Sequence, residues 1–249
     1  MRDTAAETDI RDNLGLLSTP NPSSSAVLEQ HGVTHATRFV LANPALVSLG
    51  MVNSFYEAAL HVFVFMWTPL LESRGPTVAI SGVLGSFNGT EHEKKRKGTD
   101  LVSAVPHGMV FSLFMACKMA GSLLFALVGD RVPANYTLRF VFIGGAVAFL
   151  IPLVSGSYTV ALLAFCSFEF GLGLYWPAMA VMRAELVPNH FRATMTSVFR
   201  VPLNVLVMAC LAFSGHAGEE EFLMMCFTMM TVCLALNWHA ARTSVRLLQ

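Results

Sequence analysis

The amino-acid sequence predicts an all-α membrane protein in which six transmembrane helices form one bundle. Of the 249 residues, 54% are hydrophobic and only 13% are charged, whereas about 25% of the residues in a soluble globular protein are charged. More than half of the charged residues lie in segments 1–45 and 72–105, which leaves long uncharged stretches elsewhere. This segregation excludes an ordinary soluble domain.

The uncharged stretches have the length that a membrane span requires. A helix needs about 20 mostly apolar residues to cross about 30 Å of hydrocarbon. The apolarity of these stretches is continuous rather than alternating, which favours helices over the strands of a barrel. The predicted spans are residues 46–69, 106–129, 138–156, 158–182, 194–214 and 221–240.

The spans define the domain organisation. We expect a polar, disordered N-terminal arm over residues 1–45, because its composition is too polar to build a core. A six-helix transmembrane bundle over 46–241 follows, with an external loop at 72–105. A short cytoplasmic tail at 242–249 ends the chain.

Several classes of function are not supported by the sequence. The net charge is zero, so no basic surface for nucleic acid is expected. The sequence has no HExxH, GxSxG or Walker motif, so we expect neither an enzyme nor an ATP-driven pump. We expect no cofactor and no metal site, because the five cysteines all lie within apolar runs and are interpreted as packing residues.

Arginine and lysine in the short loops predict the orientation. If both termini are cytoplasmic, most arginines outside the long loop lie at cytoplasmic helix ends, as the positive-inside rule requires. Loop 72–105 disagrees, because it contains Arg74 and the basic run 94–97, although three nearby acidic residues offset that run. Asn88 begins a glycosylation sequon that fits an external loop, whereas the sequon at Asn135 would be cytoplasmic and unused.

Four charged residues, Glu57, Lys118, Glu169 and Arg200, interrupt the apolar spans. The first three lie roughly 17 Å from the ends of their segments, near the middle of the bilayer, and Arg200 lies about 9 Å from the cytoplasmic end. A charge at the centre of a span costs at least about 2.5–3.5 kcal/mol to insert. We therefore expect these residues to face the bundle interior, a watery cavity or one another. They form either a substrate or proton pathway, which His61 could join, or a structural ion-pair network.

Short motifs along the chain resemble a known family. Segment 121–131 is similar to the loop motif that the major facilitator superfamily repeats in each half. Further matches are residues 55–57, 63–69, 105–108, 114–115, 168–169, 173–177, 182–183, 187–188 and 199–204. Together they resemble the C-terminal half of the molybdate-anion transporter family, a branch of that superfamily, over about residues 45–240.

The resemblance implies a twelve-span fold of two six-helix bundles and uptake of the oxyanion molybdate. The family's motifs share seven residues with this chain, namely Glu57, Trp67, Pro69, Glu169, Arg183, Arg200 and Asn204. Lys118, His61 and segment 85–100 depart from the family pattern. The first bundle is absent, and residues 1–40 fit a remnant of the central cytoplasmic linker.

Transport by alternating access needs two bundles around a shared site. The chain is therefore either a fragment, which we favour, or a half-transporter that pairs with a second six-helix polypeptide. A non-transporting membrane scaffold or regulator with the same fold is the alternative. We expect a plasma-membrane protein embedded in the lipid bilayer.

A dianionic substrate needs positive charge or hydrogen-bond donors along its route. Lys118 and Arg200 supply the cations within the predicted spans, and Trp67 and Asn204 are candidate donors. Glu57 and Glu169 would repel the anion unless they are protonated or paired. We therefore expect uptake of the oxyanion to be either proton-coupled or electrostatically paired.

Overall fold

The computed structural model describes residues 37–38, 40–75, 107–187, 192–214 and 218–246. Six long helices account for nearly all of them, and each is long and apolar enough to cross a membrane. The helices are α3 (Pro44–Arg74), α5 (His107–Val128), α6 (Ala134–Val154), α7 (Tyr158–Leu186), α8 (Arg192–Ser214) and α9 (Glu219–Arg246). The prediction of an all-helical protein with six candidate membrane spans is confirmed. Most of the predicted arm and of loop 72–105, Asn88 included, lies outside the described residues. The last residues of the arm are described, and α3 already begins within it at Pro44.

Local chemistry sets where two of the helices begin. Asn43 caps α3, because its Oδ1 accepts a hydrogen bond from the Ala45 amide at 3.0 Å, and Pro44 occupies the first turn. Three glutamates open α9, where negative charge is favourable beside the positive end of the helix dipole. The last of them, Glu221, accepts a hydrogen bond from the Gly218 amide at 2.6 Å.

Some helices extend beyond the apolar segments that predicted them. Helix α3 continues from Pro69, the predicted end of the first span, to Arg74. Arg74 stabilises this extension, since its guanidinium donates to the Pro152 and Ser155 carbonyls at the end of α6, both at 2.8 Å. Those carbonyls lie at the C-terminal end of α6, where no later amide of the same helix is left to donate a hydrogen bond to them. Hydropathy therefore located the apolar part of the helix and not its full length.

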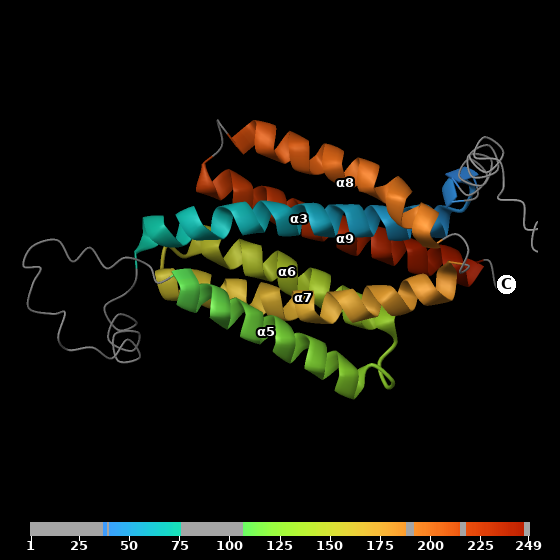
Figure 1. Cartoon of the computed structure of the whole chain (residues 1–249), viewed down its shortest axis with the longest axis horizontal. Helices are drawn as coiled ribbons and strands as arrows, with labels where there is room; N and C mark the ends of the chain where they lie inside the picture. Colours follow the sequence, from blue (N-terminus) through green and yellow to red (C-terminus); the bar gives the residue numbers. More distant parts are fainter. Residues whose placement is uncertain (1–36, 39, 76–106, 188–191, 215–217, 247–249) are drawn as a thin grey trace, which may run out of the picture.

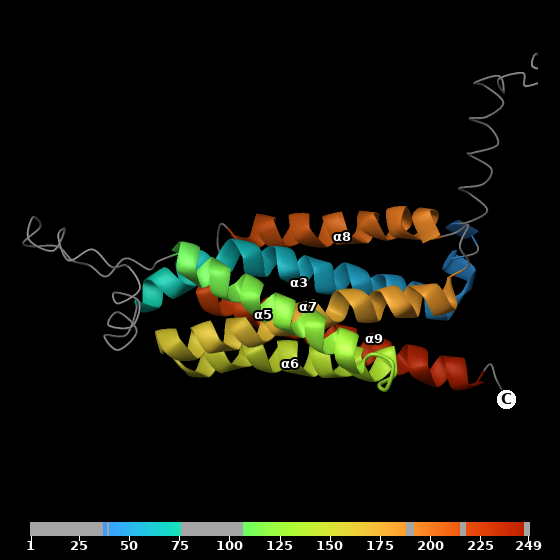
Figure 2. The same ribbon diagram turned by 60° about the horizontal axis from the view of Figure 1, so that its bottom comes forward.

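The six helices follow one another around the bundle in the order α5, α7, α6, α9, α3 and α8 (Figure 1). Helices α6 and α9 lie behind α3 and α7 in that view, and α8 and α5 form the two edges. Turning the bundle by 60° keeps α8 at one edge, with α5 crossing over α7 (Figure 2). Helices α3 and α7 make few contacts with each other, so the seam between them runs along the middle of one face.

Two kinds of packing hold the core. Phe63 of α3 lies edge-on to Phe165 and Phe168 of α7, with ring centroids 5.2 and 5.0 Å apart. Helices α5 and α7 instead approach through backbone. A Cβ atom added at Gly121 would collide with the Phe170 carbonyl oxygen, and one added at Gly173 would collide with the Lys118 carbonyl oxygen. Only glycine allows this crossing, as in other close helix pairs within membranes.

Candidate functional site

Among the described residues, Glu169 of α7 is the only charged side chain that is buried, at 4% exposure. Its Oε2 atom has no hydrogen-bond partner in the described part of the chain. Lys118 of α5 is half-buried, and its positive charge acts on this carboxyl group. The Lys118 ammonium nitrogen does not come within 4 Å of a Glu169 carboxyl oxygen. Lys118 therefore compensates the charge of Glu169 from a distance and leaves one carboxyl oxygen available.

A second polar group spans the seam between α3 and α7, with Asn53 at its centre. The Asn53 amide nitrogen donates to Glu57 Oε1 at 2.9 Å. Its carbonyl oxygen accepts from the Arg183 guanidinium at 2.9 Å and from the Tyr175 hydroxyl at 3.2 Å. Glu57 and Arg183 thus carry opposite charges on the two sides of one amide. Because an amide both donates and accepts, Asn53 joins them without a direct ion pair.

Two tyrosines connect these groups. Tyr56 and Tyr175 are fully buried and stack with ring centroids 3.7 Å apart. The Tyr56 hydroxyl has no hydrogen-bond partner among the described residues, and it lies close enough to Glu169 for the charge of that carboxylate to act on it. Polar side chains therefore continue through the bundle, from Arg183 past the tyrosine pair to Glu169 and Lys118.

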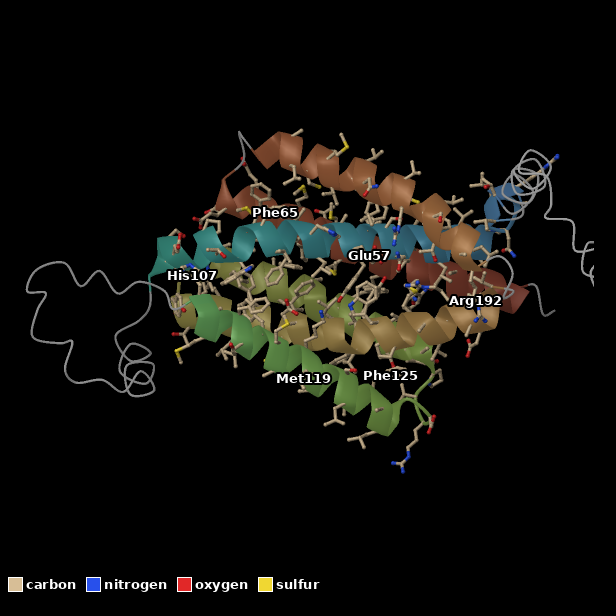
Figure 3. All side chains as sticks on the ribbon, viewed as in Figure 1. Glu57, Phe65, His107, Met119, Phe125 and Arg192 are labelled. Carbon is tan, nitrogen blue, oxygen red and sulfur yellow. The ribbon has the colours of Figure 1, made fainter. Side chains whose placement is uncertain are left out.

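Figure 3 places Glu57 about midway along α3, between His107 and Arg192, which mark the two ends of the bundle. The Arg183 side of the group borders a small pocket between α3, α7 and α8, with Asn53 and Thr196 also in its lining. The volume of about 20 Å³ admits about one water molecule. A tetrahedral oxyanion is larger, so the seam is closed to such an anion in this conformation.

Other predicted site residues lie apart from the seam. Arg200 and Asn204 are exposed on α8, and neither makes a side-chain hydrogen bond or an ion pair with a described residue. Trp67 is half-buried far along α3, where it packs on Phe114 with ring centroids 5.4 Å apart. His61 is also exposed, and its Nδ1 lies 2.6 Å from the Glu57 backbone carbonyl, not from its carboxylate. The structure thus relates Glu57 to Asn53 and Lys118 to Glu169, but it does not gather the predicted set into one cluster.

Sequence reasoning missed the central residue, Asn53, and the tyrosine pair. Asn53 lies four residues before Glu57, which is one helical turn, and this spacing alone could have revealed it. Arg183 entered the sequence analysis only as a residue shared with the family's motifs and as one of the arginines at cytoplasmic helix ends. Its contact with Asn53 depends on how α3 packs against α7, which no local pattern encodes.

Six long apolar helices, with charged and hydrogen-bonded residues within the predicted spans, define an integral membrane protein. Comparison with known proteins shows which membrane proteins the chain is similar to. The chain is 31% identical over 193 residues to the "Molybdate-anion transporter" of Danio rerio, an alignment covering 73% of this chain and 33% of that protein. It is 29% identical over 190 residues to the protein of that name from Takifugu rubripes, covering 73% and 33%. It is 26% identical over 209 residues to that of Xenopus laevis, covering 79% and 40%.

The predicted resemblance to molybdate-anion transporters is confirmed for most of the chain. The chain spans only about a third of the length of the curated relatives first matched. No protein-family profile matches it, and no solved structure does.

Proposed function

We propose that the chain forms one six-helix bundle of a secondary transporter of the major facilitator type, and that it takes up molybdate or a related oxyanion with a second bundle. The similarity to proteins named molybdate-anion transporters carries this proposal. The polar side chains within the spans support the proposal. Burying Glu169 with an oxygen that has no hydrogen-bond partner lowers the stability of a bundle, so a purely structural role does not account for it.

The substrate route of this proposal follows the seam between α3 and α7. Arg183 joins Lys118 and Arg200 as a cation for the anion, and its guanidinium suits an oxyanion because it donates several hydrogen bonds from a rigid plane. Opening the seam would replace the contact of Arg183 with Asn53 by a contact with the anion. Glu57 and Glu169 are the candidate proton carriers, because a protonated carboxyl group no longer repels the substrate.

A complementation experiment tests the function. The chain is co-expressed with the part of the Danio rerio relative that it does not match, in cells that lack molybdate uptake. Accumulation of molybdate above that given by either part alone supports the proposal. Membrane insertion of both parts without accumulation would favour the non-transporting scaffold. Competition by sulfate and tungstate then determines the selectivity among oxyanions.

The proposal includes the plasma membrane and cytoplasmic termini. Arg131, Arg139 and Arg192 lie at the end of the bundle where α3 begins, and positive residues favour the cytoplasmic side. Expression with microsomes tests the orientation, with glycosylation expected at Asn88. Glycosylation at Asn135 and not at Asn88 would invert it.

A further inference from the structure

A second cavity lies away from the seam, at the end of the bundle where α3 and α6 begin and α7 and α9 end. Its volume is about 410 Å³, within the range of about 300–1,000 Å³ that small-molecule sites occupy. Most of the lining is apolar, including Leu49 and Leu186. Two of its polar residues are buried, Ser48 of α3 and Asn237 of α9, the latter at 5% exposure.

Arg139 of α6 is the cation of this cavity, and its neighbours hold it in position. Its Nε donates to Asn237 Oδ1 at 3.4 Å. Its guanidinium carbon lies 5.3 Å from the ring centroid of Tyr136 and 5.1 Å from that of Trp238, distances that suit cation–π contact. The two terminal nitrogens have no hydrogen-bond acceptor among the described residues, and no described carboxylate lies within 4 Å. They are available to an anion that enters the cavity.

Glu185 of α7 lines the same cavity and supplies the opposite charge. It makes no ion pair with Arg139. Two opposite charges on one cavity wall, too far apart to pair directly, suit a ligand that carries an anionic group and a cationic group. Binding a zwitterion satisfies both without leaving a net charge in an apolar site.

The surroundings of the cavity indicate where such a ligand comes from. Tyr136 is 60% exposed and Trp238 is 48% exposed, and both lie at the end of an apolar span, where aromatic residues mark the membrane interface. The zwitterionic molecules abundant at that depth are phospholipids. A quaternary ammonium has no N–H to donate, whereas a primary ammonium can donate hydrogen bonds to the carboxylate of Glu185.

We propose that this cavity binds the head group of an amine-bearing phospholipid such as phosphatidylethanolamine, with the phosphate at Arg139 and the ammonium at Glu185. The site is independent of the transport proposed above. It would fix the ends of α3, α6, α7 and α9 to the lipid of one leaflet.

Native mass spectrometry of the purified full chain tests this site, with phosphatidylethanolamine, phosphatidylcholine and phosphatidylglycerol offered at equal concentration. The unmodified chain should retain phosphatidylethanolamine best. Arg139→Gln should reduce its retention about tenfold, the effect of losing one good charge-assisted contact. Glu185→Gln should remove the preference over phosphatidylcholine without reducing retention of phosphatidylglycerol.

The matched control is Arg131→Gln, which removes an exposed arginine in the turn at the same end of the bundle. It should retain phosphatidylethanolamine as the unmodified chain does. Equal retention of the three lipids, or an equal loss with Arg131→Gln and Arg139→Gln, would overturn the proposal. If Arg139→Gln does not fold, as judged by circular dichroism, the lipid preference of Glu185→Gln tests the proposal instead, because Glu185 is exposed. Displacement of the lipid by millimolar phosphoethanolamine would assign the site to a soluble ligand and overturn the lipid assignment.

Discussion

Helix α7 meets α5 and α3 in two different ways, although both contacts carry charged residues at mid-depth. At the α5 crossing the backbones touch, and Gly121 and Gly173 leave no room for a side chain. At the α3 seam the backbones do not touch in this way, and side chains bridge the helices through the hydrogen bonds of Asn53 and through packed aromatic rings. A backbone crossing has one arrangement, whereas side-chain hydrogen bonds can be exchanged for others. The comparison supports the proposal that the substrate route follows the α3–α7 seam rather than the α5 crossing.

The largest effect should come from the crossing. Gly173→Leu places a side chain against the Lys118 carbonyl, where only backbone movement could relieve the collision. We expect a loss of about 3 kcal/mol, the upper end for overpacking, measured by thermal unfolding and size-exclusion chromatography in mild detergent. Gly144→Leu on α6 is the control, because an added Cβ there meets nothing within 4 Å. A normal elution profile for Gly173→Leu would show that the crossing tolerates separation.

A smaller loss should follow from the seam. Asn53→Leu removes the acceptor of Arg183 and Tyr175 and the donor to Glu57. We expect about 2 kcal/mol, because buried polar groups lose their partners. Asn204→Leu, on the exposed face of α8, should stay within about 0.5 kcal/mol of the unmodified chain. Equal unfolding temperatures for the two variants would contradict the central role of Asn53.

A transport assay should distinguish Lys118 from Arg200, the two cations that the sequence predicts for the substrate route. In the co-expressed two-part protein, Lys118→Ala should reduce molybdate accumulation about tenfold, because a half-buried charge acts with little screening. Arg200→Ala should reduce it about two- to threefold, since Arg200 makes no hydrogen bond or ion pair with the described polar groups of the seam and lies nearer the end of its span. Surface expression is measured in parallel. Normal transport by both variants would make these cations structural and place the anion route elsewhere.

The smallest effect concerns the contact of α3 with α8. The buried Ser54 hydroxyl lies 2.9 Å from the Phe199 carbonyl of α8 and 3.0 Å from the Gly50 carbonyl of its own helix. Ser54→Ala should lower stability by about 1 kcal/mol, the usual net value of one hydrogen bond. Ser112→Ala is the control, because that exposed hydroxyl bonds only within α5. A loss of equal size in both variants would show that the interhelical bond contributes nothing of its own.

The spans could be predicted from the sequence because hydropathy and length are local properties that the bilayer tests directly. The depth of Glu57, Lys118 and Glu169 followed from counting residues along each span. Partners could not be predicted in this way. Lys118 acts on Glu169 because a glycine crossing brings α5 against α7, and the geometry of that crossing is a tertiary property.

Trp67 and Asn204 also show that tertiary position could not be predicted from residue type. Both were chosen because their side chains donate hydrogen bonds, which residue type alone reveals. Trp67 packs among aromatic rings toward one end of α3, and Asn204 lies exposed on α8. Whether they meet the proposed substrate depends on the proposed second bundle, so their role stays a prediction.

The order of the helices around the bundle has a consequence for biosynthesis. Helix α5 rests mainly on α7, yet the ribosome makes α5 two spans earlier. During that interval Lys118 is in the membrane before Glu169 exists, and α5 has to remain inserted by its own hydrophobicity. Its apolar stretch is among the more hydrophobic of the six, which offsets the cost of the lysine. The nascent chain thus holds a positive charge within the bilayer until the carboxylate that compensates it is translated.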